Sequence, residues 1–421
     1  MHFKITKTNI IEIILYIIIM MNLGYGRMVN NQYLTSINFT IVLTAFTSIV
    51  LTIFTFGKCI QKLGKSLYNT NTYVILVEFF FLVELFVSLL IKNVGFSDLS
   101  AVSCVMFLDV MLVYPLFYIM SGRVGQRFIR NVLFLLIVIL IIREINWFLY
   151  NYKGVLLFEE LLFEEKNWSR NGIYRNAEPA ITTIFYIYCC VCFSQSVEEK
   201  GKKKERIFYL FFIGFVLQYS ILVYNARLSF VVEVLIAYYV IFFHKTSNRI
   251  IFLVKGIVIL AGAIAFFSEP AQSFIFSLLS LDTSRNVYAM SGVARLRSIG
   301  KALHYIAEYP ITGLGFFNSA RRADIVGFTL SDAGFIGTIA NYGLLAWVSI
   351  IGYVCIAIRA TRKKYSRYDH TFCVSVLIMI LLIECLVNPA FTYQRIVSVP
   401  FTLSFLLLVD YRKHTFLRFK R

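Results

Sequence analysis

The side chains that could act on a ligand are concentrated in a few polar segments of an otherwise apolar sequence. One of them, YNARLSF at 224–230, places Arg227 in a very short turn between two apolar runs. A charge held at the mouth of a membrane bundle is costly, and by default it indicates a functional site. The alternative is an arginine whose side chain reaches the lipid headgroups. Arg227 is therefore the first candidate site residue.

A second segment, SGVARLRSIGKALHYIAE at 291–308, has the spacing of an amphipathic helix. Its apolar residues recur every three or four positions. Ser291 fits an N-cap, and Pro310 ends the helix. The opposite, polar face carries Arg297, Lys301, His304 and Glu308. The alternative explanation is a surface helix that lies on the membrane with its charges solvated.

A glycine turn, PITGLG at 310–315, follows this helix. Gly313 and Gly315 allow the backbone either to turn sharply or to approach a ligand closely. Beyond the turn lie the tandem pair Arg321 and Arg322 and, just before the next apolar run, Asp332. The polar segment therefore extends up to the start of that run.

The apolar composition identifies the elements that must position these side chains. Hydrophobic residues make up 59% of the 421 residues, charged residues make up 15%, and the mean hydropathy is +0.74. A soluble globular chain carries about 25% charged residues. The apolar runs have the length of about 20 residues that crosses a bilayer as a helix, whereas the strands of a membrane barrel alternate with a short period. The sequence predicts an all-α, polytopic transmembrane bundle with twelve spans, near 7–25, 36–56, 73–91, 101–120, 132–150, 179–195, 207–224, 228–243, 250–267, 333–358, 371–389 and 396–410.

Basic residues predict which loops face the cytoplasm. With the N-terminus inside, the inner loops carry most of the lysines and arginines, and the short outer loops carry little more than Arg27, Lys92, Arg227 and Arg395. Both termini are then cytoplasmic. The first run lacks a small-residue cleavage site, so we expect it to be retained as a helix. This topology and contact with anionic membrane lipids explain the formal charge of +18, and nothing in it indicates a nucleic-acid partner.

Two predicted outer loops are long, 151–178 and 268–332, and the second contains the amphipathic helix and the glycine turn. Long loops in compact proteins are usually functional or disordered. The helical patterning and the aromatic residues of these two loops argue against disorder. We therefore expect one integral membrane domain over 1–421 with a helical extracytoplasmic loop.

Charged residues inside the predicted spans allow two interpretations. Glu78 and Glu84 share one span, and Arg143 and Glu144 are adjacent in another. Such residues could pair across helices and stabilise the bundle, or they could form an ion path, which would favour a transporter. The CCVC sequence at 189–192 looks like a metal cluster. Because no histidine accompanies it, we interpret these cysteines as packing residues and expect no metal.

Three of the polar segments, in this order, resemble the O-antigen polymerase and ligase superfamily, the Wzy-type bacterial polysaccharide polymerases. NARLSF at 225–230 resembles the short outer turn with an arginine. SGVARLRSIGKALHYIAEYPITGLGF at 291–316 resembles the arginine-bearing outer helix followed by Pro-x-x-Gly-x-Gly. SDAGFIGTIANYGLLAW at 331–347 resembles the start of the next span. The matching segments cover roughly the second half of the chain.

The resemblance implies an integral membrane glycosyltransferase with a GT-C-like fold. Its donor would be a growing glycan on undecaprenyl pyrophosphate, and its acceptor a new lipid-linked oligosaccharide repeat unit, at the outer face of the bacterial cytoplasmic membrane. The glycan moves to the acceptor sugar's hydroxyl, and undecaprenyl pyrophosphate leaves. The resemblance implies no nucleotide sugar, cofactor or metal, and it makes a chain-length regulator an expected partner. The product would be capsule, exopolysaccharide or O-antigen.

The resemblance also assigns catalytic residues. A leaving pyrophosphate suits arginine, which is permanently charged and binds two oxygens at once. Arg227 and Arg295 match the family's arginine positions, and Arg297 matches them less closely. The acceptor hydroxyl needs a base. The family's ligases have a histidine just before the late span, where this sequence has Ser331 and Asp332, so either Asp332 takes that role or the base lies elsewhere, with His304 as the outer histidine.

Further substrate contacts are expected from the same outer loop. We predict that Gly313, Gly315, Arg297 and His304 contact substrate. Arg321 and Arg322 could guide glycan or phosphate, and solvated loop charges explain this pair equally well. The site as predicted contains no metal.

Three other functions are considered. A lipid-linked oligosaccharide flippase or another exporter would show two related halves, and no internal repeat is obvious. An O-antigen ligase would move finished polymer to another acceptor, and the absence of the ligase histidine favours a polymerase. An acyltransferase would require a histidine-based catalytic pair. The chain is poor in histidine, with five such residues, and this argues against an acyltransferase.

Overall fold

A computed structural model describes most of the chain. The described residues are 6–29, 36–63, 65–92, 99–100, 103, 105–162, 169–170, 172–198, 201–242, 287–317, 333–363, 366–385, 391, 395 and 397–412. Arg321, Arg322, Asp332 and the predicted span 250–267 lie outside this description. The helices that contain Arg227 and Arg295 are described, but the side chains of these two residues are not.

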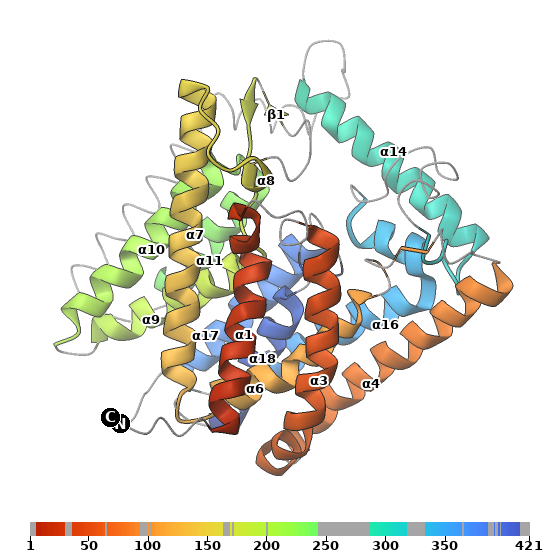
Figure 1. Cartoon of the computed structure of the whole chain (residues 1–421), viewed down its shortest axis with the longest axis horizontal. Helices are drawn as coiled ribbons and strands as arrows, with labels where there is room; N and C mark the ends of the chain where they lie inside the picture. The colour runs from red at the N-terminus through yellow and green to blue at the C-terminus, as the bar shows by residue number, and fades with distance from the viewer. Residues whose placement is uncertain are drawn as a thin grey trace.

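The N-terminal half consists of helices that run between two ends of the molecule (Figure 1). They are α1 (Lys7–Leu23), α3 (Ile37–Leu63), α4 (Lys65–Phe86), α6 (Val113–Met120) and α7 (Gly125–Lys153), with the short helical segments η1 (Tyr25–Met28), η2 (Val87–Ile91) and η3 (Leu108–Leu112). The start of α1 is fixed by Thr6, whose hydroxyl accepts a hydrogen bond from the Asn9 amide at 3.4 Å.

The C-terminal half adds a second group of helices. They are α9 (Thr182–Glu198), α10 (Lys203–Leu222), α11 (Arg227–Phe242), α14 (Val287–Glu308), α16 (Gly334–Arg362), α17 (Arg367–Met379), the π-helical segment η5 (Ile380–Cys385) and α18 (Ser398–Arg412). α9 is the most enclosed of these. All its residues from Thr182 to Val197 are buried, and α10, α11 and α17 pack around it.

The first long loop, 151–178, is not purely helical. It holds the single-turn helix α8 (Glu159–Leu162) and two short strands, β1 (Ser169–Arg170) and β2 (Ile173–Tyr174). The strands pair antiparallel, with Ser169 opposite Tyr174. In the second long loop, α14 begins at Val287, so Ser291 lies inside the helix and is not its N-cap as predicted.

Six of the described helices are long and apolar enough to cross a membrane. They are Ile37–Lys62, Asn69–Ile91, Gly125–Lys153, Lys203–Leu222, Gly334–Arg362 and Arg367–Cys385. Three shorter apolar helices cover Leu108–Met120, Ser229–Ile241 and Ser398–Tyr411. Helix is found in each predicted span that the structure describes, and the predicted span 250–267 lies outside the described residues. The prediction of an α-helical membrane protein is confirmed in this coarse form, and the number of twelve spans stays a prediction.

Helix α4 shows how such a span meets lipid. Four of its large apolar side chains are more than half exposed and follow one another at intervals of three or four residues, as Ile75, Phe79, Leu82 and Phe86. Residues at this spacing form one stripe along a helix. In water such a stripe would be unfavourable, whereas in a bilayer it faces hydrocarbon.

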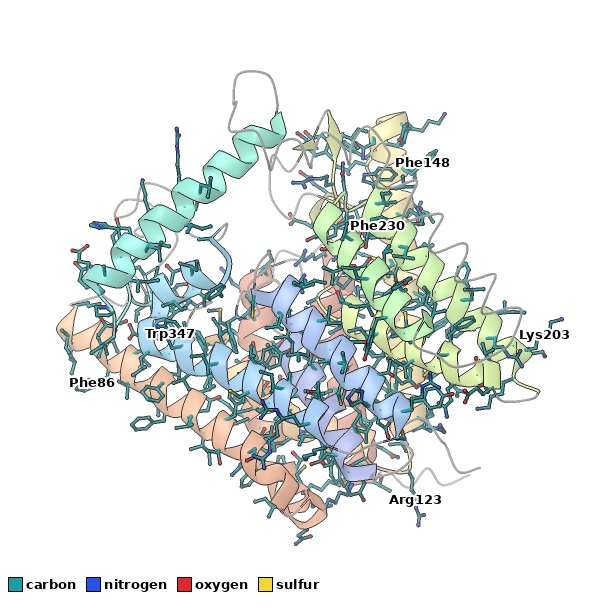
Figure 2. All side chains as sticks on the ribbon, turned by 180° about the vertical axis from the view of Figure 1, so that it is seen from behind. Phe86, Arg123, Phe148, Lys203, Phe230 and Trp347 are labelled. Atoms are coloured by element: carbon teal, nitrogen blue, oxygen red, sulfur yellow. The ribbon has the colours of Figure 1, made fainter. Side chains whose placement is uncertain are left out.

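The two ends of the bundle carry different loops. Figure 2 shows Phe148, near the end of α7, and Phe230, near the start of α11, at one end, and Arg123, just before α7, at the opposite end. The hairpin β1–β2 and helix α14 lie at the same end as Phe148 (Figures 1 and 2). The loops rich in lysine and arginine lie at the end of Arg123, which is therefore predicted to be cytoplasmic. The end of Phe148 is then extracytoplasmic, and we call it the outer end.

The cysteines of α9 lie within the helical core. Cys189 and Cys190 have no exposed surface, and Cys192 is also buried. Within the described part of the chain, no group of three or more His, Cys, Asp or Glu side chains could hold a metal ion.

Candidate functional site

Helix α16 is broken near its outer end, at Gly343. This glycine has φ 49° and ψ −125°, which is outside the helical region, although helix continues on both sides. The break removes intrahelical partners from the carbonyls of the preceding turn. Unpaired backbone groups are costly inside a membrane protein unless another segment satisfies them.

The glycine turn at 310–315 satisfies these backbone groups. The amide of Leu314 donates to the carbonyl of Ala340 at 2.8 Å, and the amide of Gly315 donates to that of Asn341 at 2.7 Å. In return, the amide of Leu344, just beyond the break, donates to the carbonyl of Ile311 at 2.7 Å. The broken span and the turn therefore complete each other.

Glycine is required on both sides of this contact. Gly313 has φ 56°, and a Cβ atom there would lie 2.5 Å from the amide nitrogen of Gly343. A Cβ atom on Gly343 would lie 2.1 Å from the carbonyl oxygen of Ile311. We call Gly313, Gly315 and Gly343 the glycine junction. The close approach that the sequence predicts for Gly313 and Gly315 is made to the backbone of α16, and both glycines are buried.

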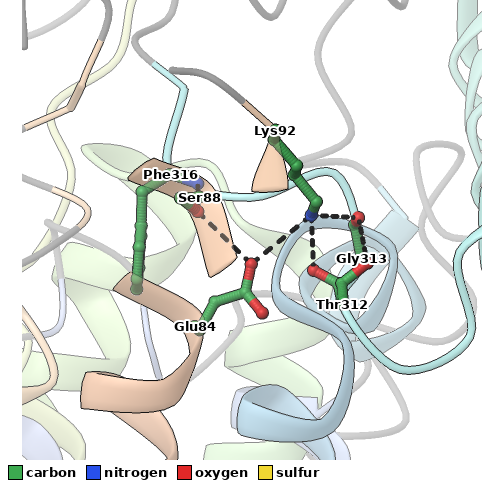
Figure 3. A network of polar contacts seen from close by, with 6 residues as sticks. All are labelled: Glu84, Ser88, Lys92, Thr312, Gly313 and Phe316. Atoms are coloured by element: carbon green, nitrogen blue, oxygen red, sulfur yellow. Dashed lines mark hydrogen bonds and ion pairs between the residues drawn. The ribbon is translucent and has the colours of Figure 1, made fainter. Parts of the chain in front are cut away.

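A partly buried lysine at the end of η2, Lys92, fastens the turn to Glu84 of α4 (Figure 3). The Lys92 ammonium donates to the carbonyls of Thr312 at 2.9 Å and Gly313 at 2.7 Å. Its charge is balanced by Glu84, whose carboxylate lies 3.5 Å away. Burial lowers the pKa of Lys92, and the negative charge of Glu84 opposes this. Ser88 lies four residues after Glu84, and its hydroxyl accepts a hydrogen bond from the backbone amide of Phe316, which follows the glycine turn.

Phe316 anchors the end of the turn in the helical core. It is fully buried, and its amide is the donor to Ser88 at 3.2 Å. Its ring packs against Phe107, Tyr342 and Phe81, with centroid separations of 6.2, 5.4 and 5.8 Å. The turn is thus held by backbone bonds, an ion pair and aromatic packing, and this rigid junction fixes where α14 ends.

Helix α14 lies across the start of α16 with two different exposed stripes. Its buried face, with Ser298 and Ala302, packs on Leu314, Ala333 and Ala340. Leu296 and Leu303 are 58% and 53% exposed and lie seven residues apart, on one stripe. Arg297, Lys301 and His304 form the adjacent exposed stripe. Such an arrangement suits an interface between lipid and water.

The structure places two predicted substrate-binding residues on this polar stripe. Arg297 is exposed, and His304 lies 3.8 Å from Glu308, one helical turn further along. The side chain of His304 is 74% exposed. His304, the alternative candidate for the base, therefore lies at the surface of α14 and not in a buried site.

A second group of charges, which sequence reasoning did not connect, lies at the outer end. Glu233 is on α11, Glu178 is just before α9, and Arg395 is just before α18. Glu233 is fully buried and Arg395 is 6% exposed. Electrostatic interactions link Glu233 to both of the others. We call these three residues the outer acid–arginine cluster.

The carboxylates of this cluster are not satisfied by hydrogen bonds. Within the described part of the chain, neither oxygen of Glu178 or Glu233 has a hydrogen-bond partner. Burial raises the pKa of Glu178 to about 7, and the positive charge of Arg395 opposes this. A buried carboxyl group whose pKa lies near neutrality can accept and release protons at physiological pH.

Neighbouring hydroxyl groups are also unsatisfied. Thr182 and Ser229 are buried, and their side-chain oxygens have no hydrogen-bond partner within the described residues. Ser220 lies beside the Glu233 carboxylate, and Ser229 is one turn before Glu233 on α11. The large majority of buried side-chain polar atoms in proteins have a hydrogen-bond partner. This concentration of unsatisfied groups therefore indicates a site that binds water or a polar ligand.

Two further contacts hold the cluster in place. Tyr186 on α9 donates to the backbone carbonyl of Glu233 at 2.9 Å. Arg143 on α7, which is 2% exposed, donates to the carbonyls of Ala177 at 2.8 Å and Leu23 at 3.2 Å. Arg143 thus fixes the segment that carries Glu178.

The predicted catalytic arginine at position 227 lies next to this cluster along the chain. Arg227 is the first residue of α11, and Glu233 is on the second turn. At 1.5 Å per residue, the two positions are about 9 Å apart along the helix axis. Glu233 of the cluster and Arg227 therefore lie on the same helix, about two turns apart.

The two helices with predicted catalytic arginines are not neighbours. α11 and α14 lie on opposite sides of the outer end, as the two opposite views show (Figures 1 and 2). Arg227 and Arg295 are therefore not brought together by the described elements.

Sequence reasoning noted Arg395 only as an isolated charge of a short outer loop, and it gave no role to Glu178 or Glu233. The available signal was the presence of ionisable residues in or beside predicted spans.

The chain matches no protein-family model, no curated protein and no solved structure.

Proposed function

We propose that this protein is a polysaccharide polymerase of the bacterial cytoplasmic membrane. It transfers a growing glycan from undecaprenyl pyrophosphate to a lipid-linked repeat unit, within a twelve-span, GT-C-like bundle with both termini in the cytoplasm. The observation that carries the proposal is the outer acid–arginine cluster, one member of which, Glu233, lies on the helix that begins with Arg227. Cations for a leaving pyrophosphate and carboxylates for a hydroxyl proton are the groups that this reaction needs.

The reaction assigns a role to each kind of side chain. The acceptor hydroxyl oxygen attacks the anomeric carbon of the donor sugar. The bond from that carbon to the phosphate oxygen breaks, and undecaprenyl pyrophosphate leaves with the electron pair. Arg227 and Arg395 stabilise the charge that develops on the leaving group, an effect worth several kcal/mol in comparable sites. The hydroxyl proton goes to a carboxylate, for which Glu178 joins Asp332 as a candidate.

Helix α14 then acts at a distance from the reacting bond. Its polar stripe with Arg297 is exposed at the outer end, and the glycine junction sets its direction. Arg295 and Arg297 there contact the lipid-linked glycan. The glycine junction is a support for this helix in the proposed mechanism.

The first experiment removes the gene and resolves the surface polysaccharide by size. A polymerase predicts loss of the long ladder with single repeat units retained. If lipid-linked units instead accumulate inside the cell, the protein is a flippase. If polymer forms but stays on its lipid carrier, the protein is a ligase.

The second experiment tests the residues with purified protein and lipid-linked repeat units. Arg227→Ala and Arg395→Ala should reduce chain growth by about 100-fold or more, the effect of removing one charge-stabilising group. Arg130→Ala, an exposed arginine in a predicted cytoplasmic loop, is the matched control and should retain activity. Full-length polymer from Arg227→Ala would sink the role of that residue.

The base is tested in the same assay by Glu178→Gln and Asp332→Asn. If one of these two carboxylates is the base, its variant should lose activity, and the variant of the other carboxylate should keep most of its activity. Glu160→Gln, an exposed acid in the same outer loop as Glu178, is the control. Normal activity in both Glu178→Gln and Asp332→Asn would show that neither carboxylate accepts the proton.

A further inference from the structure

A pocket lies at the end of the bundle opposite the outer acid–arginine cluster. It is a small, partly open pocket formed by the start of α4 and by the ends of α16 and α18. The proposed transferase reaction makes no use of this pocket, so the pocket needs a separate explanation.

The rim of the pocket is polar and carries a net positive charge. The guanidinium of Arg359 donates to the side-chain oxygen of Asn69 at 2.6 Å. Lys363 forms an ion pair with Asp410, with the ammonium nitrogen 2.5 Å from the carboxylate oxygen. Because that pair is neutral and Asn69 is uncharged, the charge of Arg359 remains. Arginine has five N–H donors, so the bond to Asn69 leaves others for a ligand.

The floor of the pocket is apolar. Ile356, Leu406 and Leu407 line it, and both leucines are 4% exposed. A free inorganic anion would gain nothing from such a floor. A molecule with an anionic head and a hydrocarbon tail would match both the rim and the floor.

The position in the membrane fits such a molecule. The three helix ends that form the pocket adjoin loops and a tail that are rich in lysine and arginine, so positive charge predicts that they are cytoplasmic. The cytoplasmic leaflet has a negative surface potential that attracts basic sites. The phosphodiester of a lipid headgroup also matches the planar donor fork of arginine.

We propose that this pocket binds the headgroup of an anionic phospholipid, with the phosphodiester on Arg359 and the first part of an acyl chain over Leu406 and Leu407. Bound lipid would link α4, α16 and α18 at their cytoplasmic ends. A ligand that binds only the folded state stabilises it, so occupancy should raise the thermal stability of the whole protein. This site is independent of the proposed function and stands or falls separately from it.

The test uses the full-length protein purified in detergent. Phosphatidylglycerol, phosphatidylcholine or inorganic phosphate is added, and the unfolding temperature and the lipid adducts seen by native mass spectrometry are measured. Phosphatidylglycerol should raise the unfolding temperature, and the other two should not. Arg359→Gln should bind phosphatidylglycerol about ten-fold more weakly, which corresponds to one charged hydrogen bond.

Matched variants separate this site from general charge. Arg362→Gln removes an exposed arginine of the same helix end that does not line the pocket, and it should bind as the wild type does. Arg359→Lys keeps the charge without the fork and should bind between the two. Equal binding by wild type and Arg359→Gln, or an equal response to inorganic phosphate, would overturn the proposal. If Arg359→Gln does not fold, Arg359→Lys and Arg362→Gln give the same comparison, and equal binding by these two overturns it.

Discussion

The glycine junction gives the sharpest prediction, because one methyl group should separate α16 from the turn that completes it. Gly343→Ala places a Cβ atom 2.1 Å from the carbonyl oxygen of Ile311 and 2.6 Å from its carbonyl carbon. Contacts under 3.0 Å are essentially absent from real side chains. Both atoms belong to backbone, so no side chain can rotate away to relieve the contact.

The magnitude follows from the bonds that the clash would break. Holding a residue other than glycine at φ 49° costs about 1–3 kcal/mol. Moving the turn away also removes the three backbone hydrogen bonds of Leu314, Gly315 and Leu344, at about 0.5–1.5 kcal/mol each. We therefore expect Gly343→Ala to lower the free energy of unfolding by roughly 2.5–7.5 kcal/mol.

The assay is unfolding of the purified protein in mixed micelles, followed by hydrogen exchange of the turn. Gly343→Ala should unfold earlier, and the amides of Leu314 and Gly315 should exchange faster. Gly300→Ala is the matched control, because a Cβ atom on this exposed glycine of α14 would meet nothing within 4 Å. It should stabilise α14 by about 0.5–1 kcal/mol. Wild-type stability and exchange in Gly343→Ala would refute the junction.

The remaining predictions concern buried charges. Lys92→Met leaves Glu84 buried without its cation and should destabilise the protein by about 3–5 kcal/mol, and a second change, Glu84→Gln, should restore part of this in the same unfolding assay. Arg143→Met should cost at least about 2 kcal/mol, since it removes charged hydrogen bonds to Leu23 and to the segment before α9. The raised pKa of Glu178 contributes stability that is present below its ordinary value of 4.5 and is lost as pH rises through about 7. Glu178→Gln should therefore be as stable as wild type near pH 4 and more stable at pH 8. The difference should be at most about 3 kcal/mol, at 1.36 kcal/mol per pKa unit. The same dependence of stability on pH in both proteins would contradict a buried carboxyl group at position 178.

The sequence by itself was enough to predict a helical membrane protein, because hydropathy and helix length are local properties. Helix over the predicted spans from 7–25 to 228–243, and again from 333–358 to the C-terminal end, follows directly from runs of apolar residues. The position of α14 was also local information, since its apolar residues recur at three and four. Its start was misplaced at Ser291, because a fitting cap residue is no proof that a helix begins there.

Tertiary structure decided what the polar residues do. Gly313 and Gly343 are 30 residues apart, and Lys92 contacts a turn more than 200 residues further along the chain. No local pattern reveals such partners. The sequence indicated that the backbone at Gly313 turns or approaches something closely, and only the packed helices show that it approaches a broken span.

The same limit applies to the outer acid–arginine cluster. In the sequence, Glu178 and Arg395 are separate polar residues at the edges of apolar runs, and Glu233 lies inside another run. Packing of α9, α11 and the segment before α18 brings their charges into one region, where burial changes the energies of the charged forms. Hydrophobic sequence thus determined the elements, and the long-range packing of those elements determined which charges meet.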